Sequence, residues 1–179
     1  MNIFAINEDV VVCAQALDDK RLNKMLTETC QTLCTVRNSM GYITPYKSTH
    51  VNHPVVKWAA SNFQHRCWLG HLGCAYYTEF RLRFAGSAHS AWDKCQSILL
   101  NYSDRYIALT DLKFVNCARH TGLGIDFTTE PNVHLAYKKY LRERWKLAIR
   151  EKNPRTIPTF TNRNPPDFAR DLKPYMHIK

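Results

Sequence analysis

The sequence lacks several features that would each point to a particular class of protein. No two of its seven cysteines have the C-x-x-C spacing of a zinc knuckle. No apolar run approaches the roughly 18 residues of a membrane span. The first residues, "MNIFAINED", have neither the basic start nor the apolar core of a signal peptide. We therefore expect a protein with no metal, no cofactor and no membrane contact.

The cysteines also indicate a reduced compartment. Their number is odd, and most of them lie among apolar residues, as buried thiols do. One group could bring metal-ligand atoms together across two helical turns, but we do not favour a metal there: His65, Cys67, His71 and Cys74. We expect buried thiols and a cytoplasmic protein.

Acidic residues are scarce, and this scarcity is uneven. The 179 residues hold 25 Lys or Arg against 15 Asp or Glu, which gives a net charge of +10. From Lys138 to the end there are twelve Lys or Arg and only four Asp or Glu. A basic C-terminal third favours a phosphate-rich partner, most commonly nucleic acid. The length suits one domain, residues 1–179, with a basic, Pro-rich tail from about residue 152.

Hydrophobic spacing predicts a mainly α-helical chain with a short N-terminal extended arm or strand at residues 2–6. Residues 103–130 carry no clear pattern, and the tail is irregular. The expected helices cover residues 10–17, a stretch from Asp18 or Asp19 to just before Gly41, residues 55 to about 84 with a break near Ser61, residues 90–102, and 131 to about 151. Asn52 is the expected N-cap of the helix that begins at Pro54.

The stretch "LDDKRLNKMLTETCQTL" places a single carboxylate among cations. At helical spacing its apolar residues share one face, while Lys20, Arg21, Lys24 and Glu28 share the other. This pattern is typical of a solvated salt-bridge face. From spacing alone we favour that interpretation, but the pattern also suits an acid or base that lies where a polyanion binds, because neighbouring cations favour the carboxylate form.

Several other residues are candidates for contact with nucleic acid. His50 and His53 precede a helix N-terminus, where an anion is favoured, although either ring could simply hydrogen-bond the loop. Arg66 could extend that patch, and Arg155 and Arg163 lie among Pro and aromatic residues in the tail, as backbone-phosphate contacts do. We expect Arg81, Arg83 and His89 at the surface, and most of the four Trp in the core.

Taken together, these motifs resemble the phage endonuclease V type of pyrimidine dimer DNA glycosylase. The resemblance rests on "MNIF" at the start, "DKR-x-x-K-M" with a glutamate in the next helical turn, "NHP" before a helix, "EFRLRF" and the basic aromatic C-terminus. It covers the first half of the chain with some order and the last third only loosely. It is closest to a branch of small phage proteins. It implies a compact all-α fold.

The resemblance also implies roles for particular residues. The family's N-terminal α-amine attacks the sugar C1′ and forms an imine, and a glutamate on an early helix assists. Glu28 corresponds to that glutamate, Arg21 to a basic residue of the site, and His53 to a loop near the DNA. The family's nucleophilic Thr is Asn2 here. Since methionine is poorly removed before Asn, the amine belongs to Met1 unless Lys20 or Lys24 replaces it.

The resulting hypothesis is a DNA glycosylase and AP lyase with Glu28 as catalytic carboxylate. It would act as a monomer on double-stranded DNA, in the host cytoplasm if phage-encoded. Two alternatives stay open. One is an enzyme that transfers a group to a modified pyrimidine in phage DNA, and the other is a non-catalytic DNA-binding protein.

Overall fold

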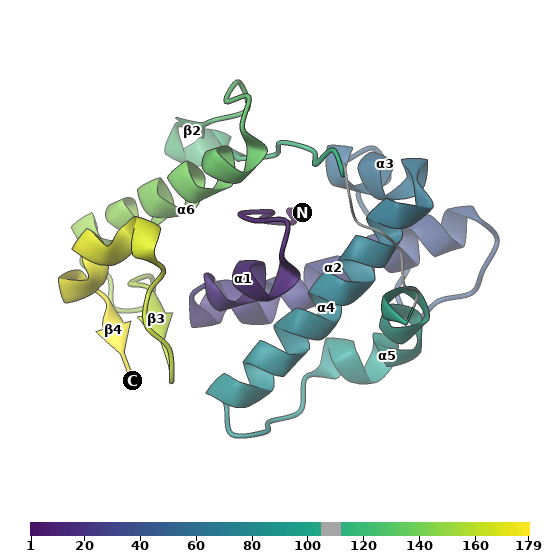
Figure 1. The fold of residues 1–179 in the computed structure, drawn as a ribbon, viewed down its shortest axis with the longest axis horizontal. Helices are drawn as coiled ribbons and strands as arrows, with labels where there is room; N and C mark the ends of the chain where they lie inside the picture. Colours follow the sequence, from purple (N-terminus) through teal and green to yellow (C-terminus); the bar gives the residue numbers. More distant parts are fainter. Residues whose placement is uncertain (105–111) are drawn as a thin grey trace.

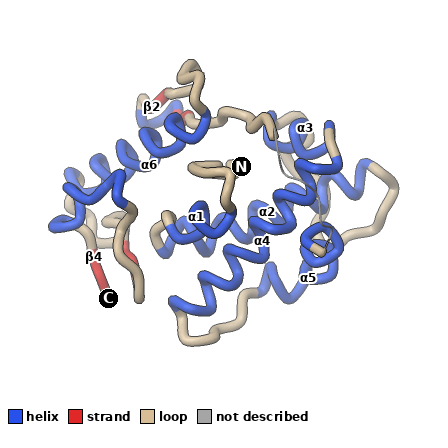
Figure 2. Tube along the Cα trace, in the orientation of Figure 1, coloured by secondary structure: helices blue, strands red, loops and turns tan. Residues whose placement is uncertain are grey.

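The structure is a computed structural model that describes residues 1–104 and 112–179. It is mainly helical, as predicted, and its few strands are two residues long (Figures 1 and 2). The elements are α1 (Val10–Gln15), α2 (Asp19–Ser39), α3 (Pro54–Ser61), α4 (Phe63–Arg83), α5 (Ser90–Ser103), β1 (Arg119–His120), the 3-10 turn η1 (Thr121–Leu123), β2 (Ile125–Asp126), α6 (Val133–Arg150), β3 (Thr159–Phe160), the 3-10 segment η2 (Asp167–Tyr175) and β4 (His177–Ile178).

Side-chain caps decide where the helices begin. Asp18, one of the two residues at which the sequence could begin this helix, accepts a hydrogen bond from the Arg21 N–H and caps α2. Gly41 follows the end of α2 with a φ of +85°, a conformation that glycine adopts without strain. The predicted break near Ser61 is confirmed by the extended residue Asn62 between α3 and α4. The predicted cap Asn52 was wrong by one residue, because the His53 ring accepts from the Val55 N–H instead.

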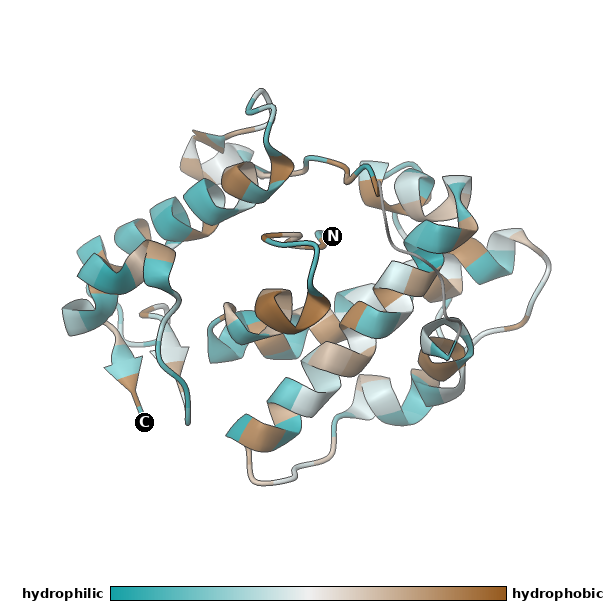
Figure 3. Cartoon of the chain, in the orientation of Figure 1, coloured by the Kyte–Doolittle hydropathy of each residue, from teal (hydrophilic) through white to brown (hydrophobic). Residues whose placement is uncertain are grey.

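The core forms where α2, α4 and α5 pack against one another. A Cβ at Gly70 would lie 2.6 Å from the Tyr102 Cβ, so glycine is needed for α4 to approach α5 this closely. The expectation for tryptophan is confirmed: Trp58, Trp68 and Trp145 are buried. Figure 3 shows α1 as largely hydrophobic and most of α6 as hydrophilic.

The N-terminal arm runs through the middle of the molecule (Figure 1). Residues 3–6 are almost completely buried and form no strand. The Tyr76 hydroxyl of α4 donates to the Ile3 carbonyl, and the His134 ring of α6 contacts the Ala5 carbonyl at 2.6 Å. The arm is therefore held between α4 and α6, which fixes the position of the chain start.

The basic tail packs back on the helices. It adds β3 and β4, which pair in parallel, and its Phe160 and Ala169 are fully buried. Figure 1 shows these segments beside α6. The predicted irregular tail is thus part of the folded structure, with its own short elements.

A buried ion-pair network joins the tail to α2 and α4. Arg83, expected at the surface, is instead 2% exposed and donates to Glu79, to Asp19 and to two carbonyl oxygens, those of Gln15 and Leu17. Arg163 then binds both carboxylate oxygens of Glu79 at 2.7 Å. Two guanidinium groups therefore share the Glu79 carboxylate, and one of them comes from the tail.

This network predicts that Arg163 stabilises the fold. Arg163→Ala removes two charge-assisted hydrogen bonds to a buried carboxylate and should lower the free energy of unfolding by about 2 kcal/mol. Urea denaturation measures the change. Arg155→Ala is the matched control, because Arg155 is exposed in the same tail and should change stability by less than about 0.5 kcal/mol. Equal stabilities of the two variants would contradict the role of the network.

Candidate active site

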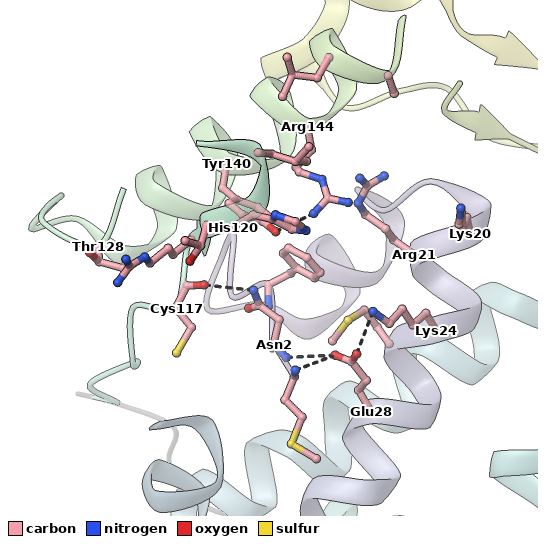
Figure 4. Close-up of a pocket in the computed structure, with 18 of the residues that line it drawn as sticks. Asn2, Lys20, Arg21, Lys24, Glu28, Cys117, His120, Thr128, Tyr140 and Arg144 are labelled. Atoms are coloured by element: carbon pink, nitrogen blue, oxygen red, sulfur yellow. Dashed lines mark hydrogen bonds and ion pairs between the residues drawn. The ribbon is translucent and has the colours of Figure 1, made fainter. Parts of the chain in front are cut away.

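A cavity of about 800 Å³ lies at the start of the chain. Its first wall comes from residues 1–54, and its second wall comes from residues 116–156, on the β1–β2 hairpin, α6 and the turn after it. Figure 4 shows side chains from both walls directed into the space between α2 and α6. The predicted residues that line it are Met1, Asn2, Lys20, Arg21, Lys24, Glu28 and His53.

Glu28 lies at the centre of the first wall, and its side chain is 13% exposed. One carboxylate oxygen accepts the Asn2 backbone N–H at 3.0 Å and lies 3.9 Å from the Met1 amine. The other lies 3.2 Å from the Lys24 Nζ. Figure 4 draws these three interactions converging on one carboxylate. An acid, a terminal amine and a second amine therefore share one site.

Asn2 fixes the terminus through its side chain. Its Oδ1 accepts from the Ile3 and Phe4 N–H groups, and its Nδ2 donates to the Cys117 carbonyl. Phe4 has a φ of +39°, an unusual conformation for a bulky residue, and such strain is often found at functional sites. The Asn2 side chain thus holds a tight, strained turn that directs the first residue toward Glu28.

Two amines lie near Glu28, and they differ in exposure. The Met1 side chain is 2% exposed and its Sδ lies 3.6 Å from the Thr32 Oγ1, whereas the Lys24 side chain is 70% exposed. The Cys117 thiol is a weaker nucleophile, because burial raises its pKa and the terminal ammonium only partly opposes this. The Met1 side chain is therefore enclosed beside Glu28, whereas Lys24 extends into solvent.

His53 lies on the cavity wall next to these groups. Burial lowers the pKa of its imidazole, and the positive charges of the chain terminus and of His50 lower it further, while Glu28 acts in the opposite direction. Its Nδ1 accepts the Val55 N–H at 3.2 Å, which requires an unprotonated Nδ1. The neutral ring consequently carries its proton on Nε2 and acts as a hydrogen-bond donor.

Asp18 anchors the base of the same wall. Burial acts to raise the pKa of its carboxyl group, but the Arg21 guanidinium and the Trp145 indole N–H outweigh burial and lower it. The indole N–H donates at 2.8 Å from α6. Asp18 therefore stays ionised, orients Arg21 and ties α6 to the start of α2.

Four of the predicted DNA contacts lie outside the residues that line the cavity. The His50 ring is beside His53, with ring centroids 6.5 Å apart. Arg66 donates to the Ala59 and Ala60 carbonyls at the end of α3, and Arg163 binds Glu79. Arg155 is exposed in the turn after α6. DNA contact by these four residues stays a prediction.

The second wall contains cations that sequence reasoning did not select. They are Arg119 and Arg144, accompanied by His120 and Tyr140. Tyr140 and Arg144 are one helical turn apart on α6, and Leu147, Ala148 and Glu151 continue the same stripe. The i, i+4, i+7 spacing was visible in the sequence, but nothing in it indicated that this stripe faces the start of α2.

The described residues contain no group of His, Cys, Asp or Glu that could hold a metal ion. Within the same parts of the chain, no helix is long and apolar enough to cross a membrane. The chemistry available in the cavity is that of an amine, a carboxylate, a neutral imidazole and several cations. This set suits attack on an electrophilic carbon next to phosphate groups.

The sequence was also compared with known proteins. Residues 1–89 match a family model described as pyrimidine dimer DNA glycosylase. No curated protein and no solved structure matches the chain. The matched residues include all of the first wall, whereas the second wall lies entirely beyond them.

The His53 environment predicts a pH-dependent stability. Because its folded pKa lies below the ordinary value of 6.5, the unfolded chain binds the proton first. The contribution of His53 to the free energy of unfolding is complete above pH 6.5. It declines as the pH falls from 6.5 through the lowered pKa of the folded state. His53→Asn keeps a capping side chain but cannot titrate. Its melting temperature should therefore fall less than that of the wild type between about pH 7.5 and pH 5.5.

Thermal melts at the two pH values measure this effect. His177→Asn, at an exposed position in β4, is the matched control for the loss of an imidazole. If His53→Asn loses as much stability on acidification as the wild type, His53 does not carry the effect.

Proposed function

Because residues 1–89 belong to the family of pyrimidine dimer DNA glycosylases, we propose that this protein excises a damaged pyrimidine from double-stranded DNA through an amine–imine intermediate. The observation that supports the proposal most directly is the Met1 amine, 3.9 Å from the Glu28 carboxylate. DNA is the substrate that the family implies, and the cations of both cavity walls suit a polyanion.

The reaction begins at the sugar carbon C1′. The neutral amine attacks C1′ and forms a C–N bond, while the bond from C1′ to the base breaks and the base leaves with a proton. Opening of the sugar ring then breaks the bond between C1′ and O4′ and gives a cationic imine. Loss of a C2′ proton and cleavage of the C3′–O bond nick the strand. Each step requires a proton acceptor or donor beside the amine.

Glu28 is placed to serve in these steps. Its oxygen near the amine can accept a proton from the ammonium that forms at this nitrogen on attack, and can later stabilise the cationic imine by charge. The Asn2 N–H holds that oxygen in place at 3.0 Å. Lys24, on the other oxygen, is mostly exposed and can move to a phosphate when DNA binds.

The retained Met1 is the proposed source of the nucleophile. An α-amine has a reference pKa about two units below that of a lysine side chain, so more of it is neutral near pH 7. The buried Met1 side chain and the hydrogen bonds of Asn2 keep the amine next to Glu28 in the cavity. Lys24 would have to move its ε-amine inward from solvent to reach the same position.

The first test is covalent trapping. Borohydride reduction in the presence of DNA with an abasic site should join the wild-type protein to DNA. Glu28→Gln should slow trapping and nicking by about 100-fold or more, because proton transfer by a positioned group contributes at least this much. Glu8→Gln removes an exposed carboxylate outside the cavity and serves as the matched control. Full nicking by Glu28→Gln would remove Glu28 from the mechanism.

A second experiment identifies the amine. Mass mapping of the trapped adduct should place the DNA on the α-amine of Met1. Lys24→Gln should still form the adduct, whereas residues added before Met1 should abolish it, because they convert the amine to an amide. An adduct on Lys24, or trapping that survives the added residues, would assign the nucleophile to a lysine.

A second candidate function is group transfer to a modified pyrimidine in DNA. The observation that favours it is that the second wall, which includes 13 of the 23 lining residues, lies beyond the family match. In that case no abasic-site adduct forms, and the mass of a modified base in phage DNA changes without release of the base or a nick.

A further inference from the structure

The second wall presents an arginine that has no carboxylate partner among the described residues. Three of the other five cations of α6 have such partners: Arg142 pairs with Asp171, Lys146 with Glu143, and Lys139 with Glu130. Arg144 lines the cavity, and its Nη1 donates to the Tyr140 hydroxyl at 3.1 Å. Its guanidinium is therefore held by a neutral group, and its charge faces the cavity.

Tyr140 is a rigid support for this guanidinium. Its side chain is buried, and its ring packs on Phe4 at a centroid distance of 5.8 Å. The Arg144 guanidinium carbon lies 5.9 Å from the centroid of the same ring. A fixed ring and hydroxyl reduce the conformational freedom of the arginine, so less entropy is lost when it binds a ligand.

A second guanidinium approaches from the opposite wall. Figure 4 shows Arg21 of α2 and Arg144 of α6 extending toward one another across the cavity. Arg21 is oriented by Asp18, and no carboxylate in the described chain pairs with Arg144. The lining also contains the carboxylate of Glu151, two helical turns further along α6. The Asp18 carboxylate binds the Nη1 of Arg21, and the other donors of both guanidinium groups match the geometry of a phosphate that lies between them.

We propose that Arg144 and Arg21 form a phosphodiester subsite that holds the DNA backbone next to the attacked sugar, with Tyr140 as the residue that positions Arg144. This inference rests on the proposed function to the extent that DNA supplies the phosphate. It assigns a binding role to the part of the chain beyond the family match. The backbone then bridges the two walls, so that the sugar lies over the Met1 amine and Glu28.

The test uses duplex DNA with a tetrahydrofuran abasic analogue, which cannot react. Single phosphates are replaced one at a time by neutral methylphosphonate linkages. The wild type should lose about tenfold in affinity when the bridged phosphate is neutral. Arg144→Gln should bind the normal duplex about tenfold more weakly, with a salt slope smaller by about one, and should no longer respond to that linkage.

Three further variants separate this contact from general electrostatics. Arg150→Gln removes the same charge from an exposed position on α6 outside the cavity lining and should stay within about twofold of the wild type. Arg144→Lys keeps the charge but loses the paired N–H donors of the guanidinium group. The change in its affinity when the bridged phosphate is made neutral should therefore be smaller than in the wild type. Tyr140→Phe keeps the ring but loses the hydroxyl that holds Arg144. Its loss of affinity should lie between that of the wild type and that of Arg144→Gln, and its altered response should be confined to the same linkage.

The outcomes distinguish this proposal from the proposed function. If Arg144→Gln responds to every neutral linkage as the wild type does, or if Arg150→Gln reproduces its loss, the subsite is refuted. A linkage-specific response without borohydride trapping would keep the subsite and refute the imine chemistry. Inorganic phosphate should compete with DNA for the wild type but not for Arg144→Gln, and this result would support an anion site at Arg144. Absence of any DNA binding would refute both proposals.

Discussion

The site depends on the burial of the N-terminal arm. Ile3, Phe4 and Ile6 are each at most 6% exposed, and burial of three such side chains contributes on the order of 5 kcal/mol. Hydrogen bonds from Tyr76 and His134 fix the intervening carbonyls. A chain start is normally free to move, but here it is continuous with the core. Packing therefore determines where the first amine lies, and the long 3.9 Å contact with Glu28 need not hold it there.

Because packing fixes the amine, the charged groups around Glu28 are not needed to hold it in place. The pair with Lys24 is weak in the resting state, since Lys24 is 70% exposed and exposed ion pairs contribute about 1 kcal/mol or less. A phosphate can therefore attract Lys24 at little cost in stability. The arrangement of one acid among several cations is explained if the cations hold DNA and the acid moves protons. Among the described residues, the pairs of the buried carboxylates Glu79 and Asp18 stabilise the fold.

Sequence patterns were most informative where structure is local. The cap at Asp18, the glycine after α2 and the break after Ser61 each depend on a few neighbouring residues, and each was predicted from the sequence. The first wall was also predictable, because Lys20, Lys24 and Glu28 share one helix. Long-range pairs were not predictable: Arg163 contacts Glu79 across 84 residues, and no local pattern indicated this pairing. Arg83 was assigned to the surface for the same reason, since its buried partners come from α1, α2 and the turn between them.

The two walls of the cavity are coupled through Phe4. Its ring contacts Tyr137 and Tyr140 of α6, while its backbone belongs to the strained turn that Asn2 holds next to Glu28. A change in the second wall can therefore reach the chain start in two ways, through the packing of Phe4 and through the hydrogen bond from Asn2 to the Cys117 carbonyl. The family match ends at residue 89, but residues 1–89 alone would leave the Phe4 ring without its contacts to Tyr137 and Tyr140. The second wall is consequently part of what sets the geometry of the first.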